Sequence, residues 1–106
     1  MKIETVTNKP QSLIKAINKA IKDGELKTWK IVSNNKDETL YSHTPEQWNE
    51  KAMLKPTVNE SSVTFDIVWW KNAGEPDEAI KGCILGRFVE ILMVHFRDNF
   101  YQLTVC

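Results

Sequence analysis

Residues 76–96 read PDEAIKGCILGRFVEILMVHF, and this stretch decides the fold. Asp77 and Glu78 stand near its beginning, where the positive end of a helix dipole favours acidic side chains. Apolar residues then cover nearly the whole circumference of the predicted helix, whereas a surface helix shows one apolar stripe. We therefore expect this helix at the centre of the molecule, packed on a sheet on one side and on a second helix or a second subunit on the other.

Two glycines, Gly82 and Gly86, lie one turn apart on the predicted helix. On a helical wheel they cluster with Ala79 and Met93. Glycine inside a helix costs about 1 kcal/mol relative to alanine, so the pair indicates a steric requirement. Either the glycines let the N-terminal helix approach closely, or this face of small residues meets the same face of a second copy in a homodimer.

A second long helix is predicted before Gly24, which supplies its C-terminal stop. Asn8 and Gln11 form a capping-box start around Pro10. Apolar residues then recur three and four positions apart and form one stripe that should lie on the sheet. The residues of this stripe are Leu13, Ile14, Ala16, Ile17, Ala20 and Ile21.

The remaining segments predict strands and one short helix. Alternating or β-branched residues indicate strands at 1–7, 28–33, 39–43, 63–70 and 100–105. The segment 54–58 contains Pro56, which confines it to an edge strand or a loop. Thr44 and Pro45 are typical of a helix start and predict a short helix near 44–52.

These elements predict an α+β fold. A single antiparallel or mixed sheet of about five to six strands, with the two long helices on one face, accommodates them with the least strain. The nearest common scheme is the ferredoxin-like arrangement, from which an extra hairpin and the short helix depart. The chain has 106 residues and a mass of 12.3 kDa, so we expect one domain over residues 1–106.

The composition is that of an ordinary globular protein, with 42% hydrophobic and 26% charged residues. Disordered and fibrous classes are therefore excluded. No segment has the ~18 uninterrupted apolar residues of a membrane span, and the first residues lack the apolar core of a signal peptide. We expect a cytoplasmic protein that has no contact with membranes and whose Cys83 and Cys106 are free thiols.

Neighbouring tryptophans mark a candidate binding face. Trp69 and Trp70 are adjacent on a strand, so one faces the core and the other faces away. If Trp69 is in the core, Trp70 lies on the open face of the sheet near Asp66, together with Tyr41 and Lys30 from the other hairpin. An exposed aromatic side chain there would anchor a protein partner. The alternative is that the segment 44–56 covers Trp70.

Charge is distributed unevenly although the net charge is zero. Residues 1–36 carry eight lysines against three acidic residues, a balance of +5, and the remainder carries −5. The lysines of the first helix region could follow a phosphate backbone, which makes nucleic-acid binding an alternative function. A solvated lysine face is the default interpretation, since the chain has only two arginines and no net positive charge. The lysines concerned are Lys15, Lys19, Lys22 and Lys27.

A third alternative is an enzyme or a small-molecule binder that uses a pocket formed by His43, Tyr41 and Asp66. The chain contains no phosphate loop, no nucleophile elbow and no paired metal-ligand spacing, so we expect neither a catalytic residue nor a metal or cofactor. The leading hypothesis is a small non-catalytic accessory or regulatory protein of bacterial or phage type. It would act by binding another protein and would itself be a homodimer.

Overall fold

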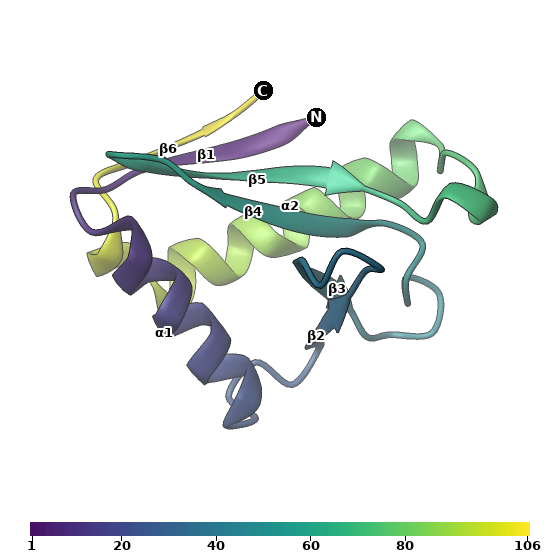
Figure 1. Ribbon diagram of the computed structural model, residues 1–106, viewed down its shortest axis with the longest axis horizontal. Coiled ribbons are helices and arrows are strands. Elements are labelled where there is room, and N and C mark those ends of the chain that lie inside the picture. Colours follow the sequence, from purple (N-terminus) through teal and green to yellow (C-terminus); the bar gives the residue numbers. More distant parts are fainter.

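The computed structural model describes residues 1–106 as one six-stranded antiparallel sheet and two long helices (Figure 1). The helices are α1 (Pro10–Lys22) and α2 (Glu78–His95). The sheet order is β2-β3-β4-β5-β1-β6. The predicted α+β class, with one sheet and two long helices, is confirmed. The strands are β1 (Lys2–Val6), β2 (Trp29–Ser33), β3 (Thr39–His43), β4 (Met53–Val58), β5 (Ser62–Val68) and β6 (Gln102–Val105).

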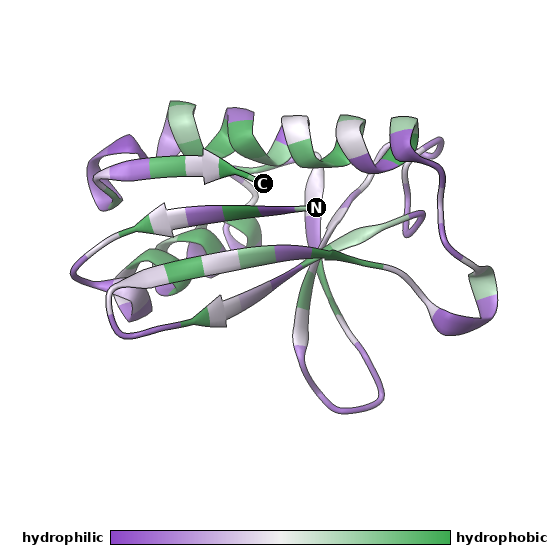
Figure 2. Ribbon diagram, turned by 90° about the horizontal axis from the view of Figure 1, so that it is seen from above, coloured by the Kyte–Doolittle hydropathy of each residue, from purple (hydrophilic) through white to green (hydrophobic).

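The chain contains a β-α-β-β-α-β unit with an inserted hairpin. Elements β1, α1, β4, β5, α2 and β6 follow the ferredoxin-like order, and β1 lies between β5 and β6. The inserted hairpin, β2 and β3, extends the sheet beyond β4. In Figure 2 it projects away from the other strands on the side opposite to α2. Two short 3-10 turns, η1 (Lys71–Ala73) and η2 (Arg97–Asn99), flank α2.

The core lies between the sheet and the helices. Alternate residues of the strands face the helices and are fully or almost fully buried. Phe88 of α2 lies at the centre of an aromatic cluster, with ring-centroid distances of 5.1 Å to Trp29, 5.6 Å to Tyr41 and 4.9 Å to Phe65. Other buried residues of the core are Ile3, Leu13, Ile17, Leu54, Val63, Ile84, Leu85 and Leu92.

Only one side of α2 is buried within the chain. An added Cβ at Gly82 or Gly86 would meet no atom within 4 Å, and both residues are exposed. The prediction that the glycines let the N-terminal helix approach closely is therefore wrong. The helix meets the sheet through its opposite side, and the glycines stay exposed.

The sequence predicted the C-terminus of α1 correctly but not its N-terminus. At the C-terminus the Gly24 N–H donates to Ile21 O (3.1 Å) and the Glu25 N–H donates to Ala20 O (2.9 Å), with Gly24 at φ 77°. These contacts form the Schellman motif that glycine favours. The predicted capping box is wrong, because Lys9 is the N-cap residue and no side chain caps the helix.

Two local predictions fail between β3 and β5. The segment 44–52 forms a series of turns instead of a helix, because Glu50 takes a left-handed backbone conformation (φ 56°) that a helix cannot contain. Pro56 lies in an interior strand. The ladder between β3 and β4 reaches only Met53 and Leu54, so β4 has no partner on that side at Pro56, and the missing N–H leaves no gap in the ladder.

Candidate functional site

The face of the sheet opposite to the helices contains a cavity of about 610 Å³, which we call the sheet-face hollow. It lies between the β2–β3 loop and the residues that follow β5, above strands β3, β4 and β5. Its size is within the range of ligand-binding pockets. Its floor is formed by Leu40, Met53 and Val68, and its walls include Trp70, Lys36 and Lys71.

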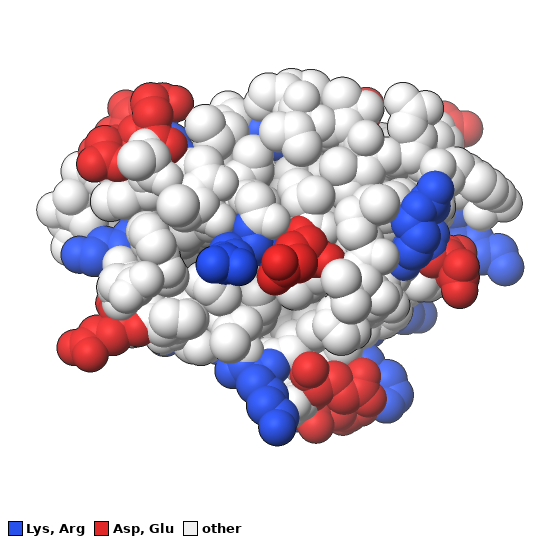
Figure 3. All heavy atoms as spheres, turned by 180° about the vertical axis from the view of Figure 1, so that it is seen from behind, with Lys and Arg blue, Asp and Glu red and all other residues white.

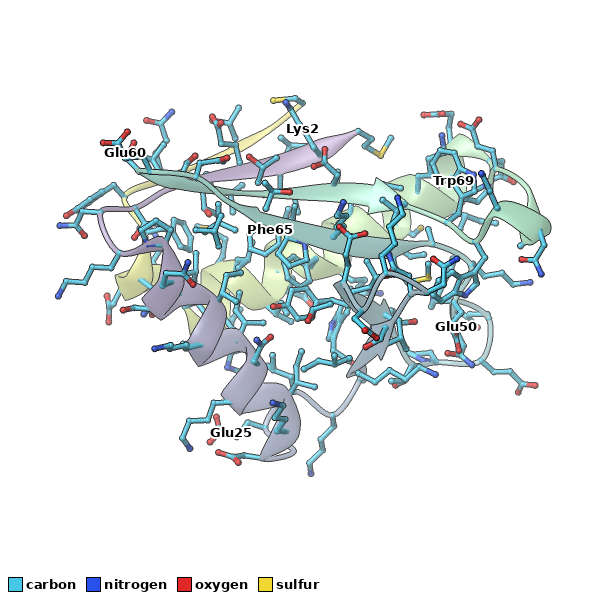
Figure 4. The ribbon with its side chains drawn as sticks, in the orientation of Figure 1. Lys2, Glu25, Glu50, Glu60, Phe65 and Trp69 are labelled. Atoms are coloured by element: carbon cyan, nitrogen blue, oxygen red, sulfur yellow. The ribbon has the colours of Figure 1, made fainter.

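Trp70 is held in place by the turn segment 44–52. Its indole Nε1 donates to Glu50 Oε1 (3.0 Å), while Lys30 Nζ donates to Glu50 Oε2 (3.3 Å). The Glu50 backbone N–H donates in turn to Ser42 Oγ (3.2 Å). Trp70 is thus half-buried and fixed by a charge-assisted hydrogen bond, and Figure 4 shows Glu50 in this turn segment. Coverage by segment 44–56, the alternative that the sequence left open, accounts for part of the Trp70 surface.

The side chains around the sheet-face hollow carry more positive than negative charge. Lys55 forms an ion pair with Glu38 (2.8 Å). The hydrogen bonds from Lys55 and then Asn34 lower the pKa of the Glu38 carboxyl. Lys36 and Lys71 form no ion pair and are exposed. With three lysines against Glu38, the lining carries a formal charge of +2.

Trp69 faces the start of α2, and Figure 4 shows it near the end of β5. Lys81 Nζ lies 5.0 Å from its ring centroid and forms ion pairs with Glu75 and Glu78. The hydrogen bonds to Glu75 and Glu78 raise the pKa of Lys81, which is only 7% exposed. This cluster anchors the first turn of α2, and its two carboxylates against one ammonium group give it a formal charge of −1.

The second candidate surface is the outer face of α2. It is mostly uncharged and largely uncovered, with Met93 47% and Val94 68% exposed. A shallow groove of about 300 Å³ runs along it, lined in part by Trp48. Figure 3 shows the molecule from this side, with a broad uncharged surface around a few charged groups. The face consists of Ala79, Gly82, Cys83, Gly86, Arg87, Glu90, Met93 and Val94.

The structure separates the residues expected on the open sheet face. Lys30 and Trp70 meet there at Glu50, and Asp66 lies on the same face, in register with Lys55. Tyr41 faces the helices instead and is fully buried. Its assignment to the partner-binding face is therefore wrong, because Tyr41 is in register with Leu54 on the core side.

The His43, Tyr41 and Asp66 pocket does not exist. Tyr41 and His43 face the core, whereas Asp66 faces the other side of the sheet. The Tyr41 hydroxyl donates to Asn18 Oδ1 (2.7 Å), and burial raises the pKa of Tyr41. His43 Nδ1 is 2.8 Å from Thr28 O. Tyr41 and His43 are hydrogen-bonded within the scaffold and lie on the opposite side of the sheet from Asp66, so this set cannot act together on a substrate.

His43 makes the stability depend on pH. Burial lowers its pKa from the ordinary 6.5, although the bond to Thr28 O opposes this, and Arg87 and Glu90 act with opposite signs. The unfolded chain therefore binds the proton first, and the free energy of unfolding should decrease as the pH decreases below about 6.5. We expect urea titrations at about pH 7.5 and pH 5.5 to show a smaller decrease for His43→Gln than for the wild type. Equal decreases would contradict this role.

The lysines considered for nucleic-acid binding lie on α1 and just after it. Lys15, Lys19, Lys22 and Lys27 are all exposed. Lys19 forms an ion pair with Asp23 (2.5 Å), so the surface carries both signs of charge. Nothing in their arrangement adds a base-reading side chain to the lysines.

Sequence reasoning missed most of the sheet-face hollow. The adjacency of Leu40 and Tyr41 was the available signal, since one of two neighbouring strand residues must face away from the core. No signal in the sequence predicts that Lys36 and Lys71, 35 positions apart, line one cavity. The link from Glu50 to Trp70 depends on a backbone conformation that glutamate rarely adopts.

Both cysteines, Cys83 and Cys106, are free and exposed. No group of three or more His, Cys, Asp or Glu side chains is placed to hold a metal ion, and none of the helices has the length and hydropathy needed to cross a membrane. No protein-family model, curated protein or solved structure matches the chain.

Proposed function

We propose that this chain is a small non-catalytic protein that acts by binding other proteins, and that it forms a homodimer through the outer face of α2. The observation that carries the proposal is the exposure of this face. Met93 and Val94 are exposed, and an added Cβ at either of the two glycines on the face would meet no atom within 4 Å. An exposed apolar patch on a small domain commonly marks a protein interface.

The sequence of α2 supports a partner on this side. Within α2, the only exposed residues with a formal charge after Glu78 are Arg87 and Glu90, because Lys81 is buried. A helix that is apolar on both sides is favoured where both sides are covered. Gly82 and Gly86 would let a second helix approach closely, which a larger side chain would prevent.

Charge complementarity favours a second copy as the partner. Arg87 Nη1 and Glu90 Oε1 are 3.8 Å apart within the chain, and both side chains are 60% exposed, so this pair is weak. A two-fold axis that crosses α2 between these residues would place each arginine opposite the glutamate of the other copy. The same surface then serves both subunits, as in most dimers with two-fold symmetry.

The test exchanges these two charges. Light scattering across a concentration series should give a mass twice 12.3 kDa for the wild type. Arg87→Glu alone and Glu90→Arg alone should each give monomers, because like charges then face each other across the axis. An equimolar mixture of the two variants should restore the dimer, since every facing pair is again of opposite sign.

Lys15→Glu, which reverses an exposed charge on α1, is the matched control and should leave the mass unchanged. A wild-type monomer at every concentration would refute the dimer. A dimer that survives both single reversals would move the interface away from α2. These two results can be told apart, because the first concerns the wild type alone.

A further inference from the structure

We infer that the sheet-face hollow binds an acidic segment of a partner protein, one that inserts an apolar side chain between two free lysines. The inference rests on the proposed function only in taking a protein as the partner. It does not require the dimer, because the sheet-face hollow and the outer face of α2 lie on opposite sides of the molecule.

Val68 and Trp70 provide the apolar contact of the sheet-face hollow, because both are only half-buried. Leu40 and Met53 are 2% and 0% exposed, although no helix lies on this side of the sheet. The walls around the hollow therefore already exclude most of the water from the floor. An aromatic or aliphatic side chain that enters the cavity of about 610 Å³ would instead cover the exposed parts of Val68 and Trp70.

The rim of the sheet-face hollow selects for negative charge. Lys36 lies in the β2–β3 loop and Lys71 lies in η1, so two separate elements contribute ammonium groups. Neither lysine forms an ion pair, although the charge of Lys36 also helps to lower the pKa of Glu38, whereas Lys55 is paired directly with Glu38. Carboxylates on either side of an apolar anchor could therefore meet both lysines at once.

Trp70 gives the sheet-face hollow a fixed wall. Its hydrogen bond to Glu50 restrains the ring before any partner arrives, so binding loses little side-chain freedom there. Tryptophan is among the residues that contribute most at protein interfaces. Glu50 is itself restrained by Lys30. Strand β2, the turn segment 44–52 and the residues after β5 therefore hold the Trp70 wall in place together.

The arrangement fits a peptide better than other anions. A compact anion such as phosphate could reach a lysine but would leave the exposed parts of Val68 and Trp70 uncovered. Nucleic acid is disfavoured because the lining contains no arginine, the residue best suited to phosphates and base edges. An extended segment can bring several carboxylates and one apolar group to different elements at the same time.

The probe is a blocked peptide with one phenylalanine flanked on each side by two glutamates. We expect it to shift the backbone amide signals of the β2–β3 loop, β4 and η1 in NMR titrations, and to change the tryptophan fluorescence. The same peptide with serine in place of phenylalanine, and a peptide with lysines in place of the glutamates, should both bind at least tenfold more weakly. Raising the salt concentration should weaken binding.

Variants of the protein locate the site. Lys36→Glu combined with Lys71→Glu should weaken binding about tenfold. Lys15→Glu combined with Lys22→Glu changes the net charge equally on exposed α1 and should leave affinity unchanged. Trp70→Phe should weaken binding without loss of the fold, because Phe keeps the apolar wall and loses only the hydrogen bond to Glu50.

Four results would overturn the inference. They are absence of shifts at about 1 mM peptide, shifts that map to α1, equal binding of the lysine peptide, and binding of phenylpropionate as tight as that of the peptide. The last result would assign the cavity to a small aromatic acid. Titrating the Arg87→Glu variant as well separates the two proposals, because loss of the dimer should leave peptide affinity unchanged.

Discussion

Replacing Phe88 with alanine is expected to lower the free energy of unfolding by about 3–5 kcal/mol. Phe88 is fully buried, and three aromatic rings surround it within 5.6 Å, centroid to centroid. These rings come from β2, β3 and β5, so Phe88 joins α2 to strands on both sides of β4. The alanine variant would leave a cavity that the three surrounding aromatic side chains cannot fill by moving inward.

Urea titration followed by tryptophan fluorescence measures this loss. Because small domains are stable by only about 5–15 kcal/mol, the alanine variant could fail to fold. Phe88→Leu keeps most of the volume, and its loss should be about 1–2 kcal/mol. Val94→Ala on the exposed side of the same helix is the control and, with all variants made in the monomeric Arg87→Glu background, should change stability by less than about 0.5 kcal/mol. Equal losses for Val94→Ala and Phe88→Ala would contradict the arrangement of α2.

Replacing both Gly82 and Gly86 with alanine should have effects of opposite sign on stability and on association. Both glycines lie inside a helix, and an added Cβ at either would meet no atom within 4 Å. Alanine stabilises such positions by roughly 0.5–1 kcal/mol each. Measured in the monomeric Arg87→Glu background, the double variant should therefore be about 1–2 kcal/mol more stable than its parent.

In the dimer the same two methyl groups would lie where the second helix approaches. The double variant without the Arg87 change should therefore dissociate at about tenfold higher concentration than the wild type, as measured by light scattering. Gly24→Ala is the matched control. The space around Gly24 is equally open, but its φ of 77° strains alanine, so stability should decrease. A double variant that is stabilised and dimerises as well as the wild type would place the interface elsewhere.

The candidate sites were partly visible in the sequence. The alternation around Trp69 and Trp70 indicated that the two rings face opposite sides, and their contacts with Lys81 and Glu50 agree. The sequence did not decide which residues of β3 face the core, because Leu40 and Tyr41 are adjacent and both can be buried. The pairing of Tyr41 with Leu54 in the neighbouring strand places Tyr41 on the core side, and no local sequence pattern contains that information.

Long periodic segments determined their own structure. The stripe of α1, the apolar helix at 78–95 and the alternation of β1 and β5 depend on contacts a few residues apart, so the sequence alone predicts them. The class of fold follows, because two amphipathic layers must bury their apolar faces against each other.

The tertiary structure alone decided which faces stay open. It placed Pro56 in an interior strand, turned Glu50 toward Trp70, and exposed the glycine side of α2. Each outcome depends on pairing between segments distant in the chain, which sets the register and the layer that covers each face. Local propensity cannot specify these choices, because the same short pattern is compatible with either face until its neighbours are fixed.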